Sequence, residues 1–194
     1  MKLLMKLFTL ISIFFLIFCL GCAGKGNPDF YLNHDIDFSY IKRVAVLPLD
    51  NLTNDKFAAD SVRHVVISEL LTTGLVDVSC PGDALAALEG LKIKQVQSLN
   101  AEQIKSIGKT LNVQAVIIGA VNKYGEVREG NVSAPEVTIT LMMADTGSGS
   151  IIWSVTRTRG GAGFMVRHFG AKSETLSETV LHVVNEAVRT LYKY

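Results

Sequence analysis

Residues 42–74 carry a pattern that predicts a strand, a polar loop and a helix. Residues 43–49 form an apolar run with few polar interruptions, as a strand covered on both faces requires. After the polar stretch 50–55, apolar residues recur at three- and four-residue steps, and Gly74 follows where a left-handed residue can end a helix. The expected buried stripe is Ala58, Val62, Val65, Val66 and Leu70, with Asp60, Arg63, His64 and Ser68 largely outside it.

Residues 75–111 predict a second strand and two more helices. The strand covers 75–79, a short helix starts near residue 81, and another starts at Asn100. Asp83 is the expected cap of the short helix, and Asn100 with Gln103 has the spacing of a capping box. The expected buried residues are Leu85, Leu88 and Leu91 in the first helix and Ile104, Ile107 and Leu111 in the second.

Three further strands are predicted between residues 114 and 159. Residues 114–121 form the most apolar run after the first 21 residues, so they are the expected central strand, in which Gly119 permits close approach of another backbone. We expect 123–135 to be a polar loop and 137–143 to be a strand, because apolar residues there alternate. A turn at 145–149 returns the chain as a hairpin partner, with Trp153 on the same face as Ile151 and Val155.

The last element is a helix, expected to be capped by Ser173 and docked on the sheet. Its apolar stripe is unbroken and its other side carries mixed charges, including His182 and Glu186. The stripe consists of Leu176, Val180, Val183, Val184, Ala187, Val188 and Leu191. The elements predict the α/β class: a single mixed β-sheet of about five strands, in the order β-α-β-α-α-β-β-β-α, covered by helices.

Residues 1–21 have the composition of a signal peptide. Lys2 and Lys6 precede an apolar core over 7–20, which falls short of the roughly 20 residues a spanning helix needs. The junction from Cys19 to Cys22 resembles a bacterial lipobox, which implies acylation of Cys22, although Cys19 stands where the pattern usually has leucine. Ala23 after that cysteine resembles the outer-membrane sorting signal.

We therefore divide the chain into a lipoprotein signal peptide (1–21), the lipidated cysteine with a tether (22–40), and an α/β domain (41–194). The later half of the tether holds four aromatic residues, which are scarce in solvated linkers, so we expect it to lie against the domain. The C-x-x-C spacing of Cys19 and Cys22 is also typical of redox or metal sites, but it falls in a cleavable segment. Cys80 is expected to be buried and inert.

Charge and motifs exclude several function classes. Two of the 19 basic residues lie in the signal peptide, which leaves 17 against 18 acidic residues, so nothing favours nucleic acid. The four histidines, His34, His64, His168 and His182, form no H-E-x-x-H pair, and no phosphate-binding loop or nucleophile elbow is present. The polar residues of 50–55 could bind a cation, or they could cap the helix and form hydrogen bonds with the loop backbone. We favour the second use. We predict no enzyme activity, metal or cofactor.

Several ordered motifs carry a family resemblance. Val44-Ala45-Val46-Leu47-Pro48-Leu49-Asp50-Asn51-Leu52-Thr53 resembles the opening of envelope lipoproteins with a domain similar to the amino-terminal domain of TolB. That group includes the curli secretion channel lipoprotein and the activators of peptidoglycan synthases. Residues 69–75, 107–119 and 145–153 resemble later parts in the same order. The resemblance implies a non-enzymatic envelope module that assembles with itself or with partner proteins.

The branches of this group make different demands. A curli-type channel inserts two membrane hairpins, each needing about 20 residues plus a turn, and the loops 123–135 and 160–172 are shorter. An activator that reaches across the periplasm calls for a long tether, and 23–40 extends only about 60 Å at most. We therefore expect a periplasmic lipoprotein on the outer membrane with an assembly, secretion-accessory or partner-binding role. Activation of a peptidoglycan synthase is the alternative, and an uncharacterised periplasmic enzyme is a less favoured one.

One apolar triplet is not explained by core packing. Phe164, Met165 and Val166 lie in a glycine-flanked segment between the last strand and the last helix. They either cap the core or form part of an oligomer or partner surface, since exposed apolar clusters usually mark one. We take these three residues as the candidate interaction surface, and the membrane, a second copy or an envelope protein as the expected partners.

Overall fold

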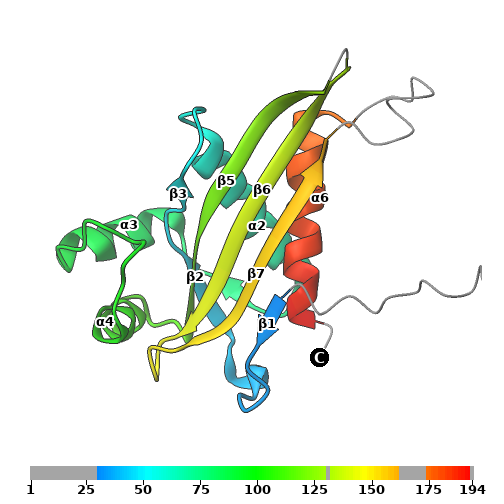
Figure 1. Cartoon of the computed structure of the whole chain (residues 1–194). Coiled ribbons are helices and arrows are strands. Elements are labelled where there is room, and N and C mark those ends of the chain that lie inside the picture. The colour runs from blue at the N-terminus through cyan, green and yellow to red at the C-terminus, as the bar shows by residue number, and fades with distance from the viewer. Residues whose placement is uncertain (1–29, 130–131, 162–173, 193–194) are drawn as a thin grey trace, which may run out of the picture.

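The computed structural model describes residues 30–129, 132–161 and 174–192. These residues form one mixed seven-stranded sheet packed against four helices, so the predicted α/β class is confirmed (Figure 1). The strands are β1 (Phe30–Leu32), β2 (Arg43–Val46), β3 (Asp50–Asn51), β4 (Asp77–Val78), β5 (Ala115–Glu129), β6 (Val132–Asp145) and β7 (Ile151–Gly160). The helices are α2 (Ala58–Thr73), α3 (Pro81–Gly90), α4 (Ala101–Leu111) and α6 (Leu176–Val188), with short 3₁₀ turns η1 (Phe38–Tyr40) and η2 (Arg189–Tyr192).

The strand order is β1-β7-β6-β5-β2-β4, with β3 beside β5. Strands β2, β4, β3 and β5 pair in parallel, whereas β5, β6, β7 and β1 pair antiparallel. This matches the expectation that strands joined through helices are parallel and that the late hairpin is antiparallel.

The sheet separates two cores. Helices α2 and α6 cover one face, and α3 and α4 cover part of the other face, on the β2 side (Figure 1). Strand β2 and the residue after it contribute to both cores by alternation. Val44 and Val46 belong to the cluster with α2 and α6, and Ala45 and Leu47 belong to the cluster with α3 and α4. The rest of that second face, along β5, β6 and β7, carries no described helix.

Two strands are additional to the predicted five. Strand β1 lies in the segment assigned to the tether, and it pairs with β7 so that Leu32 stands opposite Trp153. Strand β3 pairs its two residues with Ala120 and Val121 of β5. Strands of two or three residues are too short to show a period, so the hydrophobic pattern could not predict them.

The prediction of a polar loop over 123–135 was wrong. Strand β5 continues to Glu129 and β6 begins at Val132, so the two strands form a long hairpin arm (Figure 1). A bulge at Asn122 separates the arm from the apolar part of β5. Its outer residues face water, as in the pair of Lys123 Nζ and Glu136 Oε1 at 2.8 Å, so the arm lacks the apolar run that reveals a buried strand.

The predicted ends of the helices are partly confirmed. Gly74 ends α2 with φ +67°, and Asn100 with Gln103 forms the capping box of α4. Cys80, and not Asp83, occupies the N-cap position of α3, without a capping side-chain hydrogen bond, because Pro81 takes the first helical position. Cys80 is exposed, contrary to the prediction.

The buried faces of two elements also differ from the prediction. In α3 the buried residues are Ala84, Ala87 and Leu88, and Leu85 is exposed. In β7 a bulge at Ile152 turns Ile151 to the face of α3 and α4, so Ile151 does not share a face with Trp153. A bulge adds one residue to a strand and reverses the alternation, which a two-residue period cannot anticipate.

The last helix has the predicted buried stripe. Val180, Val183, Val184, Ala187 and Val188 are all buried against the sheet. The cap is Thr175, which forms a capping box with Glu178, whereas the predicted cap Ser173 lies outside the described residues.

Candidate functional site

The loop between β3 and α2 is held in shape by its own polar side chains. Asn51 Oδ1 accepts hydrogen bonds from the backbone N–H and the hydroxyl of Thr53 at 3.1 and 2.7 Å. Asn51 Nδ2 donates to the carbonyl of Asp55 at 2.7 Å, and Asp55 Oδ1 accepts from the N–H of Phe57 at 2.8 Å. The polar side chains thus form hydrogen bonds within the loop, which is the role that we favoured from the sequence over a cation site.

This rigid loop presents two large apolar side chains to solvent. Leu52 is 65% exposed and Phe57 is 62% exposed, and Lys56 Nζ lies 4.7 Å from the centre of the Phe57 ring. We call Leu52, Lys56 and Phe57 the loop surface. A segment already fixed by hydrogen bonds loses little conformational entropy on binding, so apolar side chains on it suit a protein contact.

Arg63 secures the helix that follows this loop. Its Nε and Nη2 donate to the carbonyl of Val46 at 3.1 and 2.7 Å, and the residue is only 5% exposed. Burial lowers the pKa of the Arg63 guanidinium from its ordinary value, while the charge of Asp60 opposes that shift. Arg63 was predicted to lie on the polar side of the helix, and the structure buries it, because a contact between an arginine and a distant backbone carbonyl leaves no pattern in the sequence.

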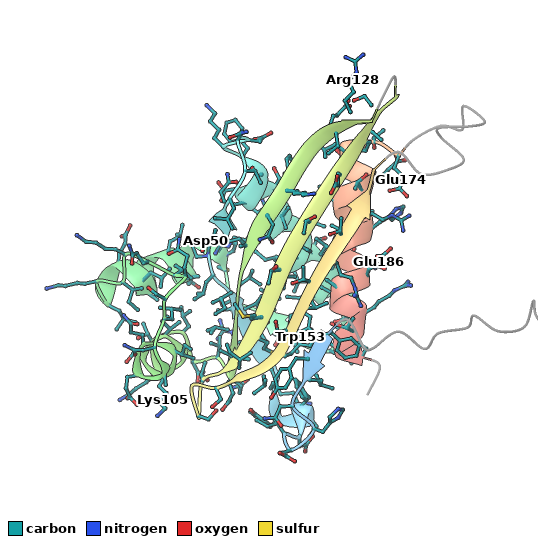
Figure 2. The ribbon with its side chains drawn as sticks, viewed as in Figure 1. Asp50, Lys105, Arg128, Trp153, Glu174 and Glu186 are labelled. Atoms are coloured by element: carbon teal, nitrogen blue, oxygen red, sulfur yellow. The ribbon has the colours of Figure 1, made fainter. Side chains whose placement is uncertain are left out.

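An ionic cluster joins the end of β7 to the start of α6. Arg159 Nη2 lies 2.5 Å from Glu174 Oε1, Arg159 Nη1 lies 2.8 Å from Glu186 Oε1, and His182 Nδ1 lies 3.1 Å from Glu174 Oε1. Figure 2 shows Glu174 and Glu186 along the β7 side of α6. The hydrogen bond between Arg159 and Glu174 raises the pKa of Arg159 and lowers the pKa of Glu174. The cluster therefore ties β7 to α6 and to Glu174, the first residue of the last described segment.

Both predicted sites, the acylated cysteine and the apolar triplet, fall outside the part of the chain that the structure describes. Phe164, Met165 and Val166 lie within 162–173, and Cys22 precedes Phe30, so all four lie outside the described residues.

The uncovered face of the sheet carries a ladder of hydroxyl groups. The hydroxyls of Thr138 and Thr158 lie 2.9 Å apart, and those of Thr140 and Thr156 lie 3.0 Å apart. Thr140 also donates to Asn122 Oδ1 at 3.0 Å. The side chains on this face are polar and form hydrogen bonds with one another, so the face can remain exposed to water.

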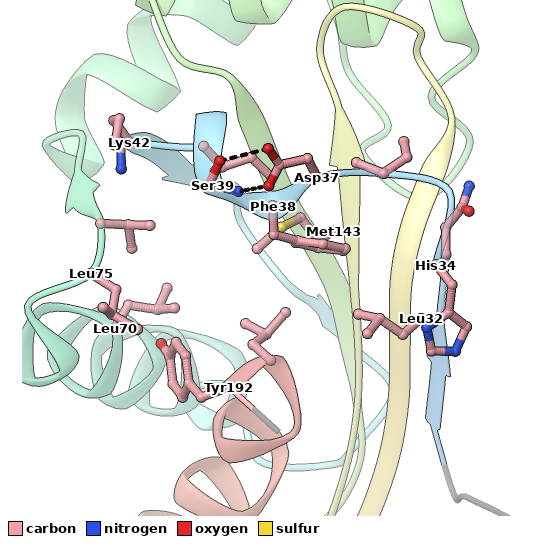
Figure 3. A pocket seen from close by; sticks show the side chains of 15 residues that line it. Leu32, His34, Asp37, Phe38, Ser39, Lys42, Leu70, Leu75, Met143 and Tyr192 are labelled. Atoms are coloured by element: carbon pink, nitrogen blue, oxygen red, sulfur yellow. Dashed lines mark hydrogen bonds between the residues drawn. The ribbon is translucent and has the colours of Figure 1, made fainter. Parts of the chain in front are cut away.

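A pocket of about 610 Å³ opens at the other end of the sheet. Figure 3 shows it between the segment after β1, the end of α2 and the turn η2. Its inner side chains are mainly apolar, including Leu32, Leu70 and Met143, and its polar lining residues include Asp37 and Lys42. Both oxygens of the Asp37 carboxylate are engaged by Ser39, through its backbone N–H at 2.8 Å and its hydroxyl at 2.7 Å.

The described residues offer little acid–base or metal chemistry. No group of three or more histidine, cysteine or acidic residues is arranged to hold a metal ion in the part of the chain described above. His64 is exposed on α2, and His182 belongs to the surface ion cluster. Within the same residues, no helix has the length and apolar character needed to cross a bilayer.

Comparison with solved structures shows which folds this chain resembles. A point variant of PelC from Paraburkholderia phytofirmans, described as a dodecamer, is 22% identical, with TM-score 0.56 and coverage of 77% of this chain and 88% of that chain. Lipoprotein GNA1162 from Neisseria meningitidis is 13% identical, with TM-score 0.56 and coverage of 79% and 99%. The hypothetical protein CT253 from Chlamydia trachomatis is 10% identical, with TM-score 0.54 and coverage of 79% and 97%. At these identities the likeness establishes a shared fold.

Sequence comparison identifies the family. No curated protein matches the chain, but the sequence model of one family, peptidoglycan-synthase activator LpoB, matches residues 31–158. That range runs from β1 through most of β7, so it contains the whole sheet except the ends of these two strands. The resemblance to envelope lipoproteins is thus confirmed at the level of one family within the group. The chain belongs to the peptidoglycan-synthase activator LpoB family.

Proposed function

We propose that this protein stimulates a peptidoglycan synthase by direct contact, as a periplasmic lipoprotein anchored in the outer membrane through Cys22. The observation that carries this proposal is the match of the LpoB family to residues 31–158. It favours the alternative of the sequence analysis over the broader assembly or secretion-accessory role. In this function the chain supplies a binding surface and no reacting group.

The loop surface is the best-supported site for that contact. Leu52 and Phe57 are exposed apolar side chains on a loop whose shape is fixed by Asn51 and Asp55. Binding energy at protein interfaces concentrates in a few apolar or aromatic anchors that lose their water on contact. Arg63 holds the start of α2 to β2, so the loop is supported at its base as well.

The anchor limits where the contact can occur. The sheet begins at Phe30, so eight residue steps separate it from Cys22, a reach of about 26 Å at ~3.3 Å per residue. The domain therefore works close to the membrane that holds Cys22. A synthase that it stimulates has to bind within the reach of this tether plus the length of the folded domain.

A polymerisation assay tests the proposed function. Purified protein is added to a peptidoglycan synthase from the same bacterium, and the consumption of a fluorescent lipid-linked precursor is followed. We expect a several-fold higher rate with the parent protein. Leu52→Ser with Phe57→Ser should abolish the increase, whereas Leu85→Ser with Leu181→Ser should retain it. The control leucines are 46% and 45% exposed on α3 and α6, so this control alters exposed apolar side chains elsewhere.

The outcomes separate the function from its site. No change of rate with the parent protein would disprove activation. Full stimulation by the Leu52 and Phe57 variant would move the contact elsewhere. The proposed surface of Phe164, Met165 and Val166 is then tested with Phe164→Ser and Met165→Ser. Sedimentation of the same samples reports self-association, the other proposed role of that triplet.

The anchor has its own test. Cys22→Ser should leave an unprocessed chain that takes up no labelled fatty acid, since the lipid is attached at that cysteine. The mass of the intact protein measures both changes. Fatty acid on the Cys22→Ser chain, or none on the parent chain, would disprove anchoring at Cys22.

A further inference from the structure

We propose that the pocket beside β1 holds one acyl chain of the protein's own Cys22 lipid. This inference rests on the acylation of Cys22 proposed above. It adds a place for one chain of the anchor inside the folded domain, at the end of the sheet where the tether joins it.

The lining of the pocket suits a hydrocarbon chain. Leu32 comes from β1, Leu70 from α2 and Met143 from β6, so three elements that are distant in sequence supply apolar side chains to one cavity (Figure 3). Its volume of about 610 Å³ lies within the range typical of small-molecule sites. Asp37, the acidic residue of the lining, is exposed, and its carboxylate accepts two hydrogen bonds from Ser39, so its charge lies at the solvent side of the pocket.

Tyr192 lines the pocket, and its hydroxyl oxygen is buried. Burial raises the pKa of this hydroxyl, which lies next to Thr73. A phenol whose oxygen is covered presents mainly its apolar ring to the cavity, so Tyr192 adds to the apolar lining.

The length of the tether puts the anchor within reach of the pocket. Leu32, in the pocket wall, is only two residues beyond Phe30, the first described residue. The eight steps from Cys22 to Phe30 span at most about 26 Å, so the acyl chains stay close to the mouth. A chain tethered at this distance has a high effective concentration at the pocket compared with free lipid.

The surroundings of the pocket also suit a membrane surface. Tyr31 and Tyr40, on the two segments that flank it, are exposed, and so is Leu75 in its lining. Tyrosine is enriched where proteins meet the bilayer interface. Stable anchoring uses more than one acyl chain, so one chain can enter the pocket while another remains in the bilayer. Both places remove the chain from water, so the exchange between them carries little hydrophobic penalty.

Photo-cross-linking in the intact cell tests the proposal. The bacteria are grown with a long-chain fatty acid that carries a diazirine in mid-chain and a terminal alkyne, which labels the Cys22 lipid. After irradiation, the full-length protein is isolated and digested, and peptides joined to the Cys22 peptide are identified by mass spectrometry. We expect cross-links to peptides that contain residues 32–42, 70–76 or 191–192 of the same chain.

Variants that fill the pocket provide the comparison. Ile36→Trp at a half-buried lining position, and Leu75→Trp at an exposed one, should each reduce these cross-links at least fivefold. Leu85→Trp, on α3 and outside the pocket lining, should leave them unchanged. A variant is compared only if its melting temperature matches that of the parent. Leu75→Trp is expected to meet this condition, because the larger side chain is added at an exposed position.

Each outcome supports or overturns the proposal. Cross-links only to phospholipid, or only to peptides outside the pocket, would overturn it, as would pocket cross-links that persist in both tryptophan variants. Labelling of the pocket peptides in Cys22→Ser cells would show that a membrane lipid, and not the protein's own anchor, fills the pocket. If the intact mass of the parent shows no acyl group, the acylation of Cys22 has failed and this inference falls with it. Stimulation of the synthase is measured without this label, so a failure of the proposed function can be told apart from a failure of the pocket proposal.

Discussion

The indole nitrogen of Trp153 donates a 2.9 Å hydrogen bond to the hydroxyl of Thr190. Thr190 in turn donates to the carbonyl of Ala187 at 2.7 Å, and both bonded side chains are buried. Trp153 also stands opposite Leu32 in the pairing of β7 with β1. One tryptophan thus connects the first strand, the sheet and the turn after the last helix, which are the elements that bring Leu32 and Tyr192 to the pocket.

Removing this bond should destabilise the fold. Thr190→Val keeps the shape of the side chain but leaves the buried indole N–H without an acceptor, which costs about 1–3 kcal/mol. Chemical denaturation monitored by circular dichroism measures the change. Thr110→Val is the matched control on exposed α4 surface, with an expected change within about 0.5 kcal/mol. Equal losses in the two variants would show that the Trp153 bond contributes nothing specific.

Hydrophobic periodicity predicted the parts of the fold that bury one face over many residues. Ile104, Ile107 and Leu111 of α4 and the stripe of α6 are buried as expected, because three or more turns of a helix display the 3.6-residue period clearly. The capping box of Asn100 and Gln103 was also predicted from the sequence, since it depends only on two residues three positions apart.

Two of the misses share a physical cause, because each depends on a partner distant in sequence. Strand β1 exists through its pairing with β7, and Arg63 is buried because the Val46 carbonyl accepts its two N–H groups. The hairpin arm of β5 and β6 is polar because little covers its outer face. Of the sites, the polar loop 50–55 was recognised. Its exposed residue Leu52 and the nearby Phe57 were not selected, since exposure of an apolar residue is visible only in the fold.

The buried face of α6 can be checked by one pair of substitutions. Val184 is fully buried, so Val184→Asp would place an unpaired carboxylate in the core and cost several kcal/mol. Glu186 bonds Arg159 at the surface, where the two side chains are 42% and 38% exposed, so Glu186→Ala should cost about 1 kcal/mol or less. Thermal melts measure both. Similar shifts would mean that the two faces of the helix have been assigned incorrectly.

The contact between Tyr40 and Asp145 predicts a dependence on alkaline pH. Burial and the 2.8 Å hydrogen bond to Asp145 raise the pKa of Tyr40 to about 12 from 10.0. Because the folded pKa is the higher one, the neutral phenol stabilises the fold below pH 10, and this contribution is lost as the pH rises towards 12. The unfolding free energy of the parent minus that of Tyr40→Phe should therefore be constant from about pH 7 to 9 and then shrink.

Ultraviolet titration gives an independent reading of the same tyrosine. The absorbance change of the phenol that titrates near pH 12 should lose one equivalent in Tyr40→Phe. In Asp145→Asn the Tyr40 step should move towards pH 10, since the negative charge opposing phenolate formation is gone. An unchanged titration curve in Tyr40→Phe would contradict the assigned pKa.

The central strand should tolerate no side chain at Gly119. A Cβ built there would lie 2.2 Å from the backbone carbonyl oxygen of Thr140 on β6, and 3.1 Å from the Cα of Leu141. Backbone atoms of a paired strand cannot turn away as a flexible side chain would, so Gly119→Ala should force β5 and β6 apart and cost about 1–3 kcal/mol or more. Gly90→Ala is the matched control, because a Cβ at the end of α3 meets nothing within 4 Å. It should leave stability unchanged or raise it by up to about 1 kcal/mol, since alanine favours the helix more than glycine. Denaturant midpoints measure both variants, and a Gly119→Ala protein as stable as the parent would disprove the close approach of the two strands.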